Sequence, residues 1–365
     1  MSSFGSRNSR GGRMCPGRRG LSATREARAA SALALLLGSA PACAPSDGGA
    51  APAALEVHDD VGRRVALRRP VRRIVSAVPS ATDLLLALGA ADRLIARTDY
   101  DTDPRLAHLP SLGRDIHPGI EAVLALRPDL VIAQPDEAGR GFVAGLDAVG
   151  VAVYAVDVHR QRVAGIAATA RRLALLIGEA ARGDSLAIAI ESGLDSLRRT
   201  TPPGPRPSVL YVVWHQPAYA AGAGSYVHEL IEAAGGVNVL GDVRLEWPEV
   251  GLEEIVRRDP DYIVVPSGRD ALRPEWLADL PGWRELGAVR ERRVIVVDND
   301  LFNRPGPRVV EAARVLADAL REREAAALRR RGAEIPRVRG AAVQPGVRSA
   351  PRRTREPAPP ASGAR

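Results

Sequence analysis

The sequence predicts an α/β protein built from two similar lobes in tandem, and a duplicated segment is the first observation behind this prediction. Residues 119–133 read GIEAVLALRPDLVIA, and residues 251–265 read GLEEIVRRDPDYIVV. Each copy has a glycine, a glutamate two places on, a Pro-Asp pair nine places on and then an apolar run. Because the residue before proline avoids the α-helical region, a short helix is expected to end there. The apolar run has no polar alternation, which favours a strand buried on both faces of a parallel sheet.

A second, looser repeat and one long helical stretch complete the prediction. The segment SATDLLLALG at 80–89 precedes the first copy, and SYVHELIEAAG at 225–235 precedes the second. Residues 160–200 have a helical pattern that only Gly178 and Gly183 interrupt. Its second half, about 179–199, is expected to be roughly 30 Å long at 1.5 Å per residue. We therefore predict an N-terminal lobe at 55–158, a helical segment at 159–205 and a C-terminal lobe at 206–325.

The remaining elements are expected in the following order. In the first lobe we expect a hairpin over 55–71 around Asp60–Gly62, a strand at 72–78 that ends at 79–81, a helix at 82–88, a strand at 94–97, a loop at 98–118 and a strand at 151–156. In the second lobe we expect a strand at 209–213, a helix at 226–234, a strand at 294–297, a loop at 298–307 and a final helix from 308 to about 323.

The basic charge of the chain is concentrated at its ends. The formal net charge is +8, but residues 1–50 hold seven arginines against two acidic residues, and residues 326–365 hold ten against two. The part between them has 34 arginines and 39 acidic residues, so it is mildly acidic. All basic residues are arginine, which indicates genomic base composition rather than nucleic-acid binding. The tail at 326–365 has few large apolar residues and is expected to be disordered.

The first 54 residues have the layout of an export signal followed by a tether. Residues 1–42 are basic and then apolar from 29 to 42, which is too short to span a bilayer and typical of a signal peptide. The only cysteines are Cys15 and Cys43, and Cys43 follows Ala-Pro-Ala at the expected cleavage point. Cleavage there predicts a lipoprotein acylated on Cys43, with a flexible tether at 43–54. An ordinary signal peptide with a chance cysteine is the alternative, and both Sec and twin-arginine export remain open.

The candidate ligand site lies on loops that follow predicted strands. In α/β sheets, ligands collect beyond the carboxyl ends of the strands. Aromatic residues make up only 4% of the chain, yet four of them fall within 34 positions between Trp214 and Trp247. Large flat side chains suit a macrocycle or a metal chelate. The candidate ligand-binding residues are Tyr100, Asp115, Trp214, His215, Tyr219, Trp247, Phe302 and Arg304.

Other aromatic and histidine side chains are expected to have structural roles. Tyr211 and Tyr262 lie inside predicted strands and are assigned to the core, and Trp276 and Trp283 are expected to pack. The six histidines include no pair at metal-binding helix spacing, so no bare metal-ion site is predicted. His215 and His117 could each provide an axial ligand to a chelated metal, but a lone loop histidine is more often a hydrogen-bonding residue. His228 is expected to be structural or exposed.

The sequence carries none of the common catalytic motifs. We find no Gly-x-Ser-x-Gly elbow, no Walker loop and no metal-hydrolase helix. Ser80 has no histidine near it in the motif and is interpreted as a helix cap or hydrogen-bond donor. No enzymatic activity and no catalytic cofactor are therefore predicted.

At this point a family resemblance can be stated. The leader, the two lobes, the joining helix and the duplicated units resemble the bacterial ABC-importer substrate-binding proteins of the helical-backbone family for iron chelates, haem and cobalamin. The matching domain covers about 73–325. The stretches RRIVSAVPSATDLLLALGA, WHQPAYAAGAGSYVHELIEAAGGVNV and DNDLFNRPGPRVVEA look closest to the cobalamin-binding branch, although the last is shared with the iron-chelate branch. The resemblance implies the class III periplasmic-binding-protein fold, in which a single long helix joins two Rossmann-like lobes that move little.

The resemblance also implies a function and partners. The chain would capture cobalamin or a related metal chelate between its lobes and deliver it to an ABC permease and its ATPase. Haem or ferric-siderophore binding is the alternative, and an envelope sensor, a scaffold or an uncharacterised α/β enzyme is the alternative of another class. We expect a monomer in the periplasm or cell envelope, held at the membrane by a lipid anchor on Cys43, with no nucleic-acid partner.

Glu121 and Glu253 occupy the same place in the two duplicated units. In the family that the chain resembles, glutamates at the matching positions meet arginines of the permease, so both are predicted to dock there. The alternative is that each carboxylate only stabilises the N-terminus of its helix through the helix dipole.

Overall fold

The computed structural model describes residues 55–67, 70–115, 118–135, 137–201, 204, 206–267 and 274–334. All of them belong to one compact unit, residues 51–365. The predicted signal peptide, the tether with Cys43, His117 and the tail beyond residue 334 lie outside the described residues, as does the side chain of Trp276.

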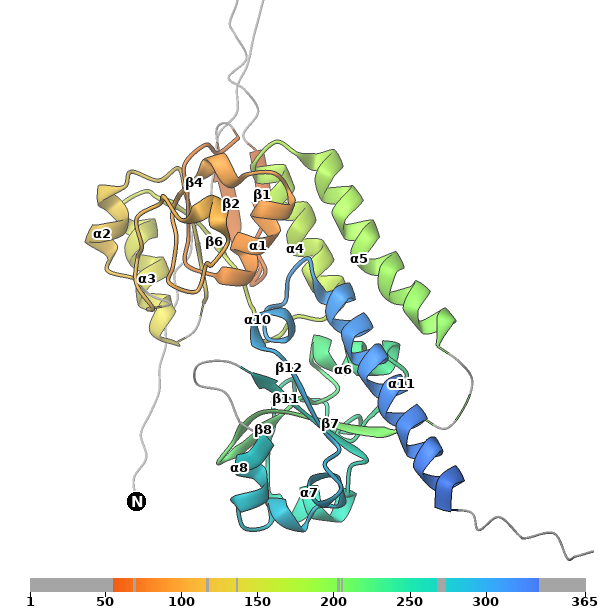
Figure 1. Ribbon diagram of the computed structural model, residues 1–365. Helices are drawn as coiled ribbons and strands as arrows, with labels where there is room; N and C mark the ends of the chain where they lie inside the picture. Colours follow the sequence, from red (N-terminus) through yellow and green to blue (C-terminus); the bar gives the residue numbers. More distant parts are fainter. Residues whose placement is uncertain are drawn as a thin grey trace, which may run out of the picture. The chain divides into compact units, whose positions relative to one another are not determined.

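The first lobe is a four-stranded parallel sheet with a hairpin beside it (Figure 1). The sheet order is β4-β3-β5-β6. Its strands are β3 (Ile74–Ser76), β4 (Leu94–Ala96), β5 (Leu130–Ala133) and β6 (Ala152–Ala155). The helices are α1 (Pro79–Ala87), α2 (Ile120–Ala125) and α3 (Glu137–Ala148). The predicted hairpin is confirmed as β1 (Leu55–His58) and β2 (Arg64–Leu67), with Gly62 at φ +82° in the turn, a conformation that favours glycine.

The second lobe repeats this arrangement around a mixed sheet. Its strand order is β10-β8-β7-β11-β12, with β9 beside β7. The strands are β7 (Ser208–His215), β8 (Ala218–Ala220), β9 (Val237–Asn238), β10 (Glu249–Val250), β11 (Tyr262–Ser267) and β12 (Val294–Asp298). The helices are α6 (Tyr226–Ala233), α7 (Leu252–Arg258), α8 (Pro274–Asp279), α9 (Gly287–Arg290) and α10 (Asn299–Phe302).

The duplicated units form equivalent parts of the two sheets. In each unit a short helix, α2 or α7, leads into a central strand that has a parallel neighbour on either side, β5 in one sheet and β11 in the other. Leu130 and Ile132 of β5 join one hydrophobic cluster, while Val131 and Ala133 join another on the opposite face. Burial on both faces explains why the apolar runs lack polar alternation, and this prediction is confirmed.

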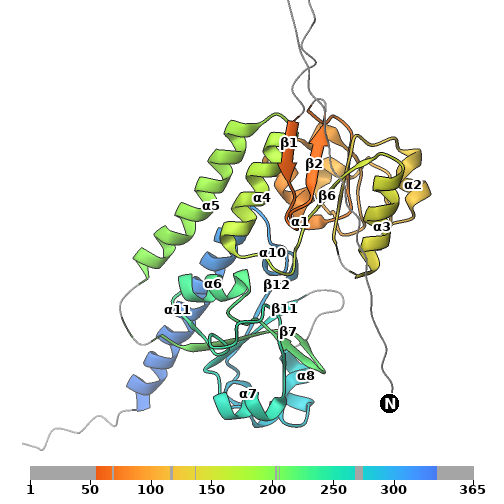
Figure 2. The ribbon, with the colours of Figure 1, turned by 180° about the vertical axis from the view of Figure 1, so that it is seen from behind.

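Three long helices carry the connection between the lobes, and they lie side by side in Figures 1 and 2. They are α4 (Val163–Leu176), α5 (Ala180–Thr200) and α11 (Val309–Glu334). Gly193 on α5 faces α11 so closely that an added Cβ would lie 2.9 Å from Val310 Cγ1. One continuous hydrophobic cluster contains residues of both lobes and of these helices. The α5 connection is therefore packed along its length.

Some local predictions were wrong or incomplete. The final helix continues to Glu334 rather than ending near Arg323, because the Ala-, Glu- and Arg-rich residues 322–334 are strong helix formers. The predicted loop at 298–307 begins with helix α10, and strands β8 and β10 were not predicted. Ser80 is not a cap: α1 begins at Pro79, and the buried Ser80 hydroxyl has no hydrogen-bond partner. The lobe boundaries given above remain our proposal.

Candidate functional site

An exposed row of polar and aromatic side chains crosses three strands of the second lobe. Trp214, near the end of β7, is paired in register with Tyr219 on β8, and Tyr219 is paired with Glu249 on β10. The Tyr219 hydroxyl donates to Glu249 Oε2 at 3.2 Å, and this carboxylate raises the pKa of Tyr219. Trp214 is 46% exposed and Tyr219 is 37% exposed. Two large rings are thus presented to solvent near the carboxyl end of β7, and both lie within strands rather than on the predicted loop, because β7 continues to His215 and pairs with β8.

The indole of Trp214 is held by contacts with the two residues that follow it in the chain. Its Nε1 donates to the Gln216 carbonyl oxygen at 3.0 Å, and its ring lies 5.5 Å from the ring of His215. His215 is half-buried, and its Nδ1 has no hydrogen-bond partner within the described part of the chain. The local contacts therefore orient Trp214 without covering it.

Trp247 and Phe302 belong to an aromatic cluster inside the second lobe. Phe302 is 0% exposed and stacks on Tyr211, with ring centroids 6.2 Å apart. The half-buried Trp247 lies 6.4 Å from both Tyr211 and Tyr226. The Tyr226 hydroxyl donates to the Phe302 carbonyl oxygen at 2.6 Å. Because its ring is fully enclosed, Phe302 packs the core, and we leave it out of the proposed ligand set.

Several other aromatic and histidine residues were predicted to have structural roles. Tyr211, Tyr262 and Trp283 are buried as predicted. His228 is half-buried beside Asn238, with Nδ1 3.3 Å from the amide nitrogen, and burial lowers the pKa of His228. It therefore has the structural role that the sequence suggested.

In the first lobe, the loop after β4 exposes one aromatic ring. Tyr100 is 39% exposed, and the Arg114 guanidinium carbon lies 5.6 Å from its ring centroid, a cation–π distance. The turn is fixed by Asp101, which accepts from the Thr98 backbone nitrogen at 2.7 Å and from its hydroxyl at 2.8 Å. Asp115 is exposed on the same loop.

Arg304 lies between the lobes and contacts both. Its Nη2 donates to the Tyr100 carbonyl oxygen at 2.6 Å, and its Nη1 lies 3.5 Å from Asp83 on α1. It also pairs with Asp300 of its own lobe at 3.0 Å. Burial raises the pKa of Asp83, although Arg304 opposes this rise, and the neighbouring Asp101 carboxylate adds to it. Sequence reasoning missed Asp83, because only the fold brings α1 beside residue 304.

The cavity next to Arg304 is strongly charged. It has a volume of about 700 Å³ and contains five acidic side chains and three arginines from both lobes. Its lining residues are Asp83, Leu86, Ala87, Thr102, Asp103, Pro104, Arg105, Asp298, Asp300, Leu301, Arg304, Pro307, Arg308 and Glu311. Charges of both signs without an aromatic ring make this cavity unlike the exposed aromatic row.

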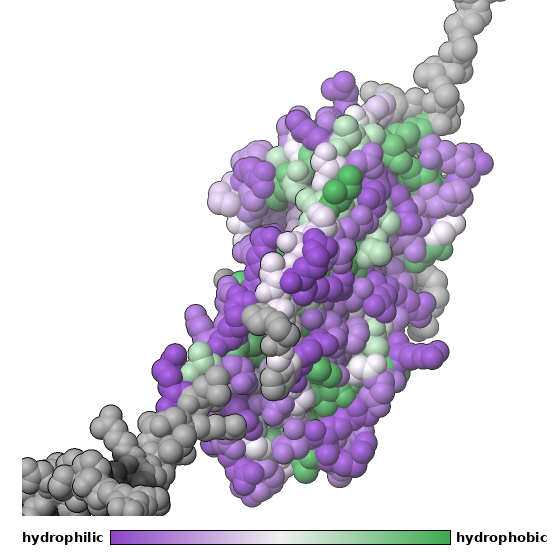
Figure 3. Space-filling view, turned by 90° about the vertical axis from the view of Figure 1, so that its right-hand side faces the viewer, coloured by the Kyte–Doolittle hydropathy of each residue, from purple (hydrophilic) through white to green (hydrophobic). Residues whose placement is uncertain are grey.

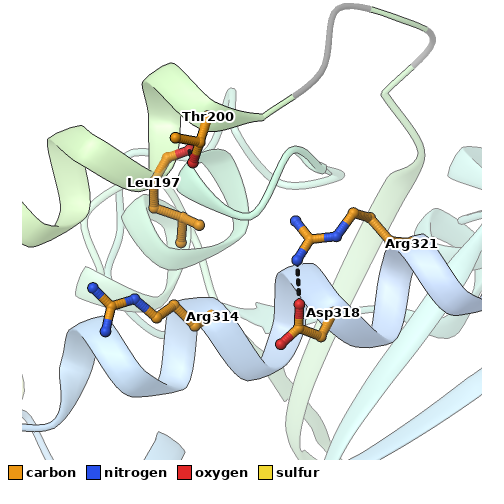
Figure 4. Close-up of a pocket in the computed structure, with 5 residues that line it drawn as sticks. All are labelled: Leu197, Thr200, Arg314, Asp318 and Arg321. Carbon is orange, nitrogen blue, oxygen red and sulfur yellow. Dashed lines mark hydrogen bonds and ion pairs between the residues drawn. The ribbon is translucent and has the colours of Figure 1, made fainter.

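A second cavity lies between α5 and α11, away from the strand ends. Figure 4 shows Leu197 and Thr200 of α5 facing Arg314 and Arg321 of α11, with Arg321 paired to Asp318. The surface that Figure 3 shows, which is the right-hand side of Figure 1, is mostly hydrophilic, with apolar groups in small separate areas. Neither this surface nor its cavity offers the flat apolar contacts that a chelate needs.

The two duplicated glutamates have matching geometry. Glu121 and Glu253 are both exposed at the second residue of a short helix, α2 or α7, after a glycine N-cap. Each carboxylate turns back over that glycine: an added Cβ on Gly119 would lie 3.8 Å from Glu121 Oε2, and one on Gly251 would lie 3.4 Å from Glu253 Oε2. Within the described residues, neither carboxylate has an ion-pair partner. Both are thus available on the surface.

The described residues contain neither a candidate metal-ion cluster nor a helix that could span a membrane. No cluster of three or more His, Cys, Asp or Glu side chains is placed to hold a metal ion there. In the same part of the chain, no helix combines the length and apolar character needed to cross a bilayer.

The two α/β lobes and the helical connection define a periplasmic solute-binding protein. Residues 74–301 match the periplasmic binding protein family, and the chain belongs to this family. It is thus a binding protein of the α/β class and not an enzyme.

Two curated proteins and one solved structure are examples of the proteins to which the chain is similar. The chain is 28% identical over 270 residues to the uncharacterized ABC transporter substrate-binding lipoprotein YvrC of Bacillus subtilis, covering 72% of this chain and 84% of that protein. It is 28% identical over 245 residues to the vitamin B12-binding protein of Vibrio cholerae, covering 67% and 87%. The apo structure of the periplasmic haem-binding protein RhuT from Roseiflexus sp. RS-1 has a TM-score of 0.60 and 27% identity, covering 68% and 97%.

Proposed function

We propose that this chain is the substrate-binding component of an ABC importer, and that it captures cobalamin or a related metal chelate between its lobes. The exposed Trp214–Tyr219 pair is the observation that carries the proposal. Two exposed aromatic residues paired in register on adjacent strands offer apolar contacts of the kind that a corrin or porphyrin ring needs, at a low cost in conformational entropy. Tyr100 of the first lobe adds a third exposed ring, and Asp115, His215, Trp247 and Arg304 complete the proposed set.

The ligand proposal also draws on the relatives. One is named a vitamin B12-binding protein and another a haem-binding protein, and vitamin B12 and haem both contain a large flat ring system. Cobalamin is our first candidate because the sequence stretches around Ser80 and Trp214 resemble the cobalamin-binding branch of the family. Haem and a ferric siderophore are the alternatives.

The partners and location follow from the same assignment. The chain would deliver its chelate to a permease that works with an ATPase, with Glu121 and Glu253 as the docking carboxylates. Their exposure and matched geometry support this, since an exposed carboxylate without a partner is available to an arginine of another protein. We further propose a monomer that is exported and acylated at Cys43, because the relative YvrC is named a lipoprotein.

A ligand screen tests this proposal. The purified protein is incubated separately with cyanocobalamin, hemin and a ferric hydroxamate siderophore, passed through a desalting column and examined by visible spectroscopy. We expect one chelate to co-elute at about one molecule per chain, and expect Trp214→Ala to reduce the amount retained. Elution of the protein without any of the three chelates would contradict the proposed ligand class.

A further inference from the structure

In addition to the chain connection through α5, the second lobe makes charged contacts at two separate places, one with the first lobe and one with the start of α4, a helix that packs on α1 and β1 of the first lobe. The first place is the loop between α10 and α11. Arg304 on this loop donates to the Tyr100 carbonyl oxygen at 2.6 Å and lies 3.5 Å from the Asp83 carboxylate. The backbones are close as well: a Cβ added to Gly306 would lie 3.5 Å from the Ser80 carbonyl oxygen. The loop is therefore seated directly against the start of α1.

The second place is the beginning of α4. Glu229, on α6 of the second lobe, accepts from the Val163 backbone nitrogen at 2.7 Å and from Arg162 Nη2 at 3.1 Å. Arg162 also donates to the Ala223 carbonyl oxygen at 3.2 Å. No side chain at the N-cap of α4 satisfies its first backbone N–H groups. A carboxylate from the other lobe caps the helix instead, where the helix dipole favours negative charge.

The Asp83–Arg304 pair and the Glu229 carboxylate are shielded from solvent, whereas Arg162 is 51% exposed, so the buried part of the second contact is the one between Glu229 and the Val163 backbone nitrogen. The side chain of Arg304 is 14% exposed, that of Asp83 27% and that of Glu229 17%. Charge pairs that are partly buried are screened less by salt than exposed ones. Removing the Asp83 charge also leaves the Arg304 charge poorly solvated, and removing the Glu229 charge weakens the acceptor of the Val163 backbone N–H, which adds to the loss. Each carboxylate thus favours the observed spacing of the lobes over a wider one.

We propose that Asp83 and Glu229 are positioning residues that set the distance between the two lobes. Asp83 acts through Arg304, whose other contact holds the Tyr100 backbone, so the same pair also fixes the aromatic loop of the first lobe. Glu229 acts through the capped end of α4. The distance between the lobes then depends on these two charged contacts as well as on the packing of the long helices.

Distances between spin labels test this proposal without any ligand. In the full chain with Cys15 and Cys43 replaced by serine, Val149→Cys and Val256→Cys place one label on the exposed surface of each lobe. Pulsed electron paramagnetic resonance then gives the distribution of distances between the labels. We expect Asp83→Asn to broaden this distribution and lengthen its mean. Glu229→Gln tests the second contact separately. If either Asp83→Asn or Glu229→Gln fails to fold, the remaining variant still tests the proposal.

Asp195→Asn is the matched control. It removes an exposed Asp–Arg pair of 2.8 Å that lies entirely within α5, so it is expected to leave the distribution unchanged. The double variant Asp83→Asn with Glu229→Gln is expected to show the largest change. A wild-type distribution in the double variant would overturn the proposal, as would an equal change in the Asp195 control.

The consequence for binding rests on the proposed function and is measured separately. With cyanocobalamin or hemin, whichever the wild type retains, Asp83→Asn is expected to raise Kd about fivefold, equivalent to about 1 kcal/mol. Asp83→Glu keeps the charge and is expected to recover most of the affinity. Unchanged label distances contradict the positioning role, whereas a wild type that binds no chelate contradicts only the proposed function.

Discussion

Trp214→Ala should separate ligand binding from folding, because the indole is oriented but not buried. With 46% of the residue exposed and one hydrogen bond to the Gln216 carbonyl, the ring contributes little to the core. Its removal is expected to change the free energy of unfolding by no more than about 0.5 kcal/mol, the usual range for surface sites. Losing a large aromatic contact to ligand should cost about 1–3 kcal/mol in binding, a factor of about 5 to 150 in Kd.

Trp247→Ala provides the contrast. Its ring packs beside Tyr211 and Tyr226 in the core of the second lobe, so truncation leaves a space that these rings cannot fill completely. We expect a loss of about 2–3 kcal/mol in unfolding free energy, below the cost of a fully buried tryptophan. The melting temperature should fall by about 5 °C or more.

Urea denaturation and calorimetric ligand titration of both variants measure the two effects. We expect Trp214→Ala to keep its denaturation midpoint and lose affinity, and we expect Trp247→Ala to lose stability as well as affinity, since Trp247 packs in the core and belongs to the proposed ligand set. If Trp214→Ala lowered stability as much as Trp247→Ala while leaving Kd unchanged, the exposed aromatic row would not be the ligand surface.

Three further predictions concern the anchor, the docking carboxylates and the helix packing. Cys43→Ser should move the protein from the membrane to the soluble fraction of cells, and a wild type found wholly in the soluble fraction would refute acylation. Glu121→Ala and Glu253→Ala should leave chelate affinity unchanged but impair uptake. The double variant with arginine at both positions should impair uptake most. Normal uptake by this double variant would show that both glutamates only stabilise their helices. Gly193→Ala should lower the unfolding free energy by about 1–3 kcal/mol, because its new Cβ would lie 2.9 Å from Val310 Cγ1. If urea denaturation instead showed that the free energy of unfolding rises by about 1 kcal/mol, as expected at an open helix position, the two helices would be able to move apart to accept the new Cβ.

The architecture could be predicted because local and repeated signals agreed. The spacing of glycine, glutamate and Pro-Asp located α2–β5 and α7–β11 in advance, and the unbroken apolar runs indicated strands covered on both faces. Turn glycines such as Gly62 marked where strands end. These features depend on neighbouring residues only, so sequence patterns contain them.

The site was predicted less completely because it depends on contacts between distant segments. Phe302 and Trp214 are both aromatic residues near strand ends, yet one is enclosed and the other exposed. The difference arises because Phe302 lies on helix α10 and stacks on Tyr211, whereas Trp214 lies in β7 and pairs with Tyr219 of the short strand β8, and neither α10 nor β8 has a clear local pattern. Asp83 and Glu229 were missed for a similar reason, since their partners lie in the other lobe. A carboxylate on a helix has no local signal that distinguishes an interlobe contact from a solvated surface.

Calorimetric titration of the wild-type chain with cyanocobalamin, alongside Trp214→Ala as the matched variant, tests the central claim most directly. Binding of about one cobalamin per chain, weakened at least fivefold by the substitution, is the result predicted here from the loss of one large aromatic contact. The absence of binding to cobalamin, to hemin and to a ferric hydroxamate under the same conditions would contradict the claim that the lobes capture a metal chelate.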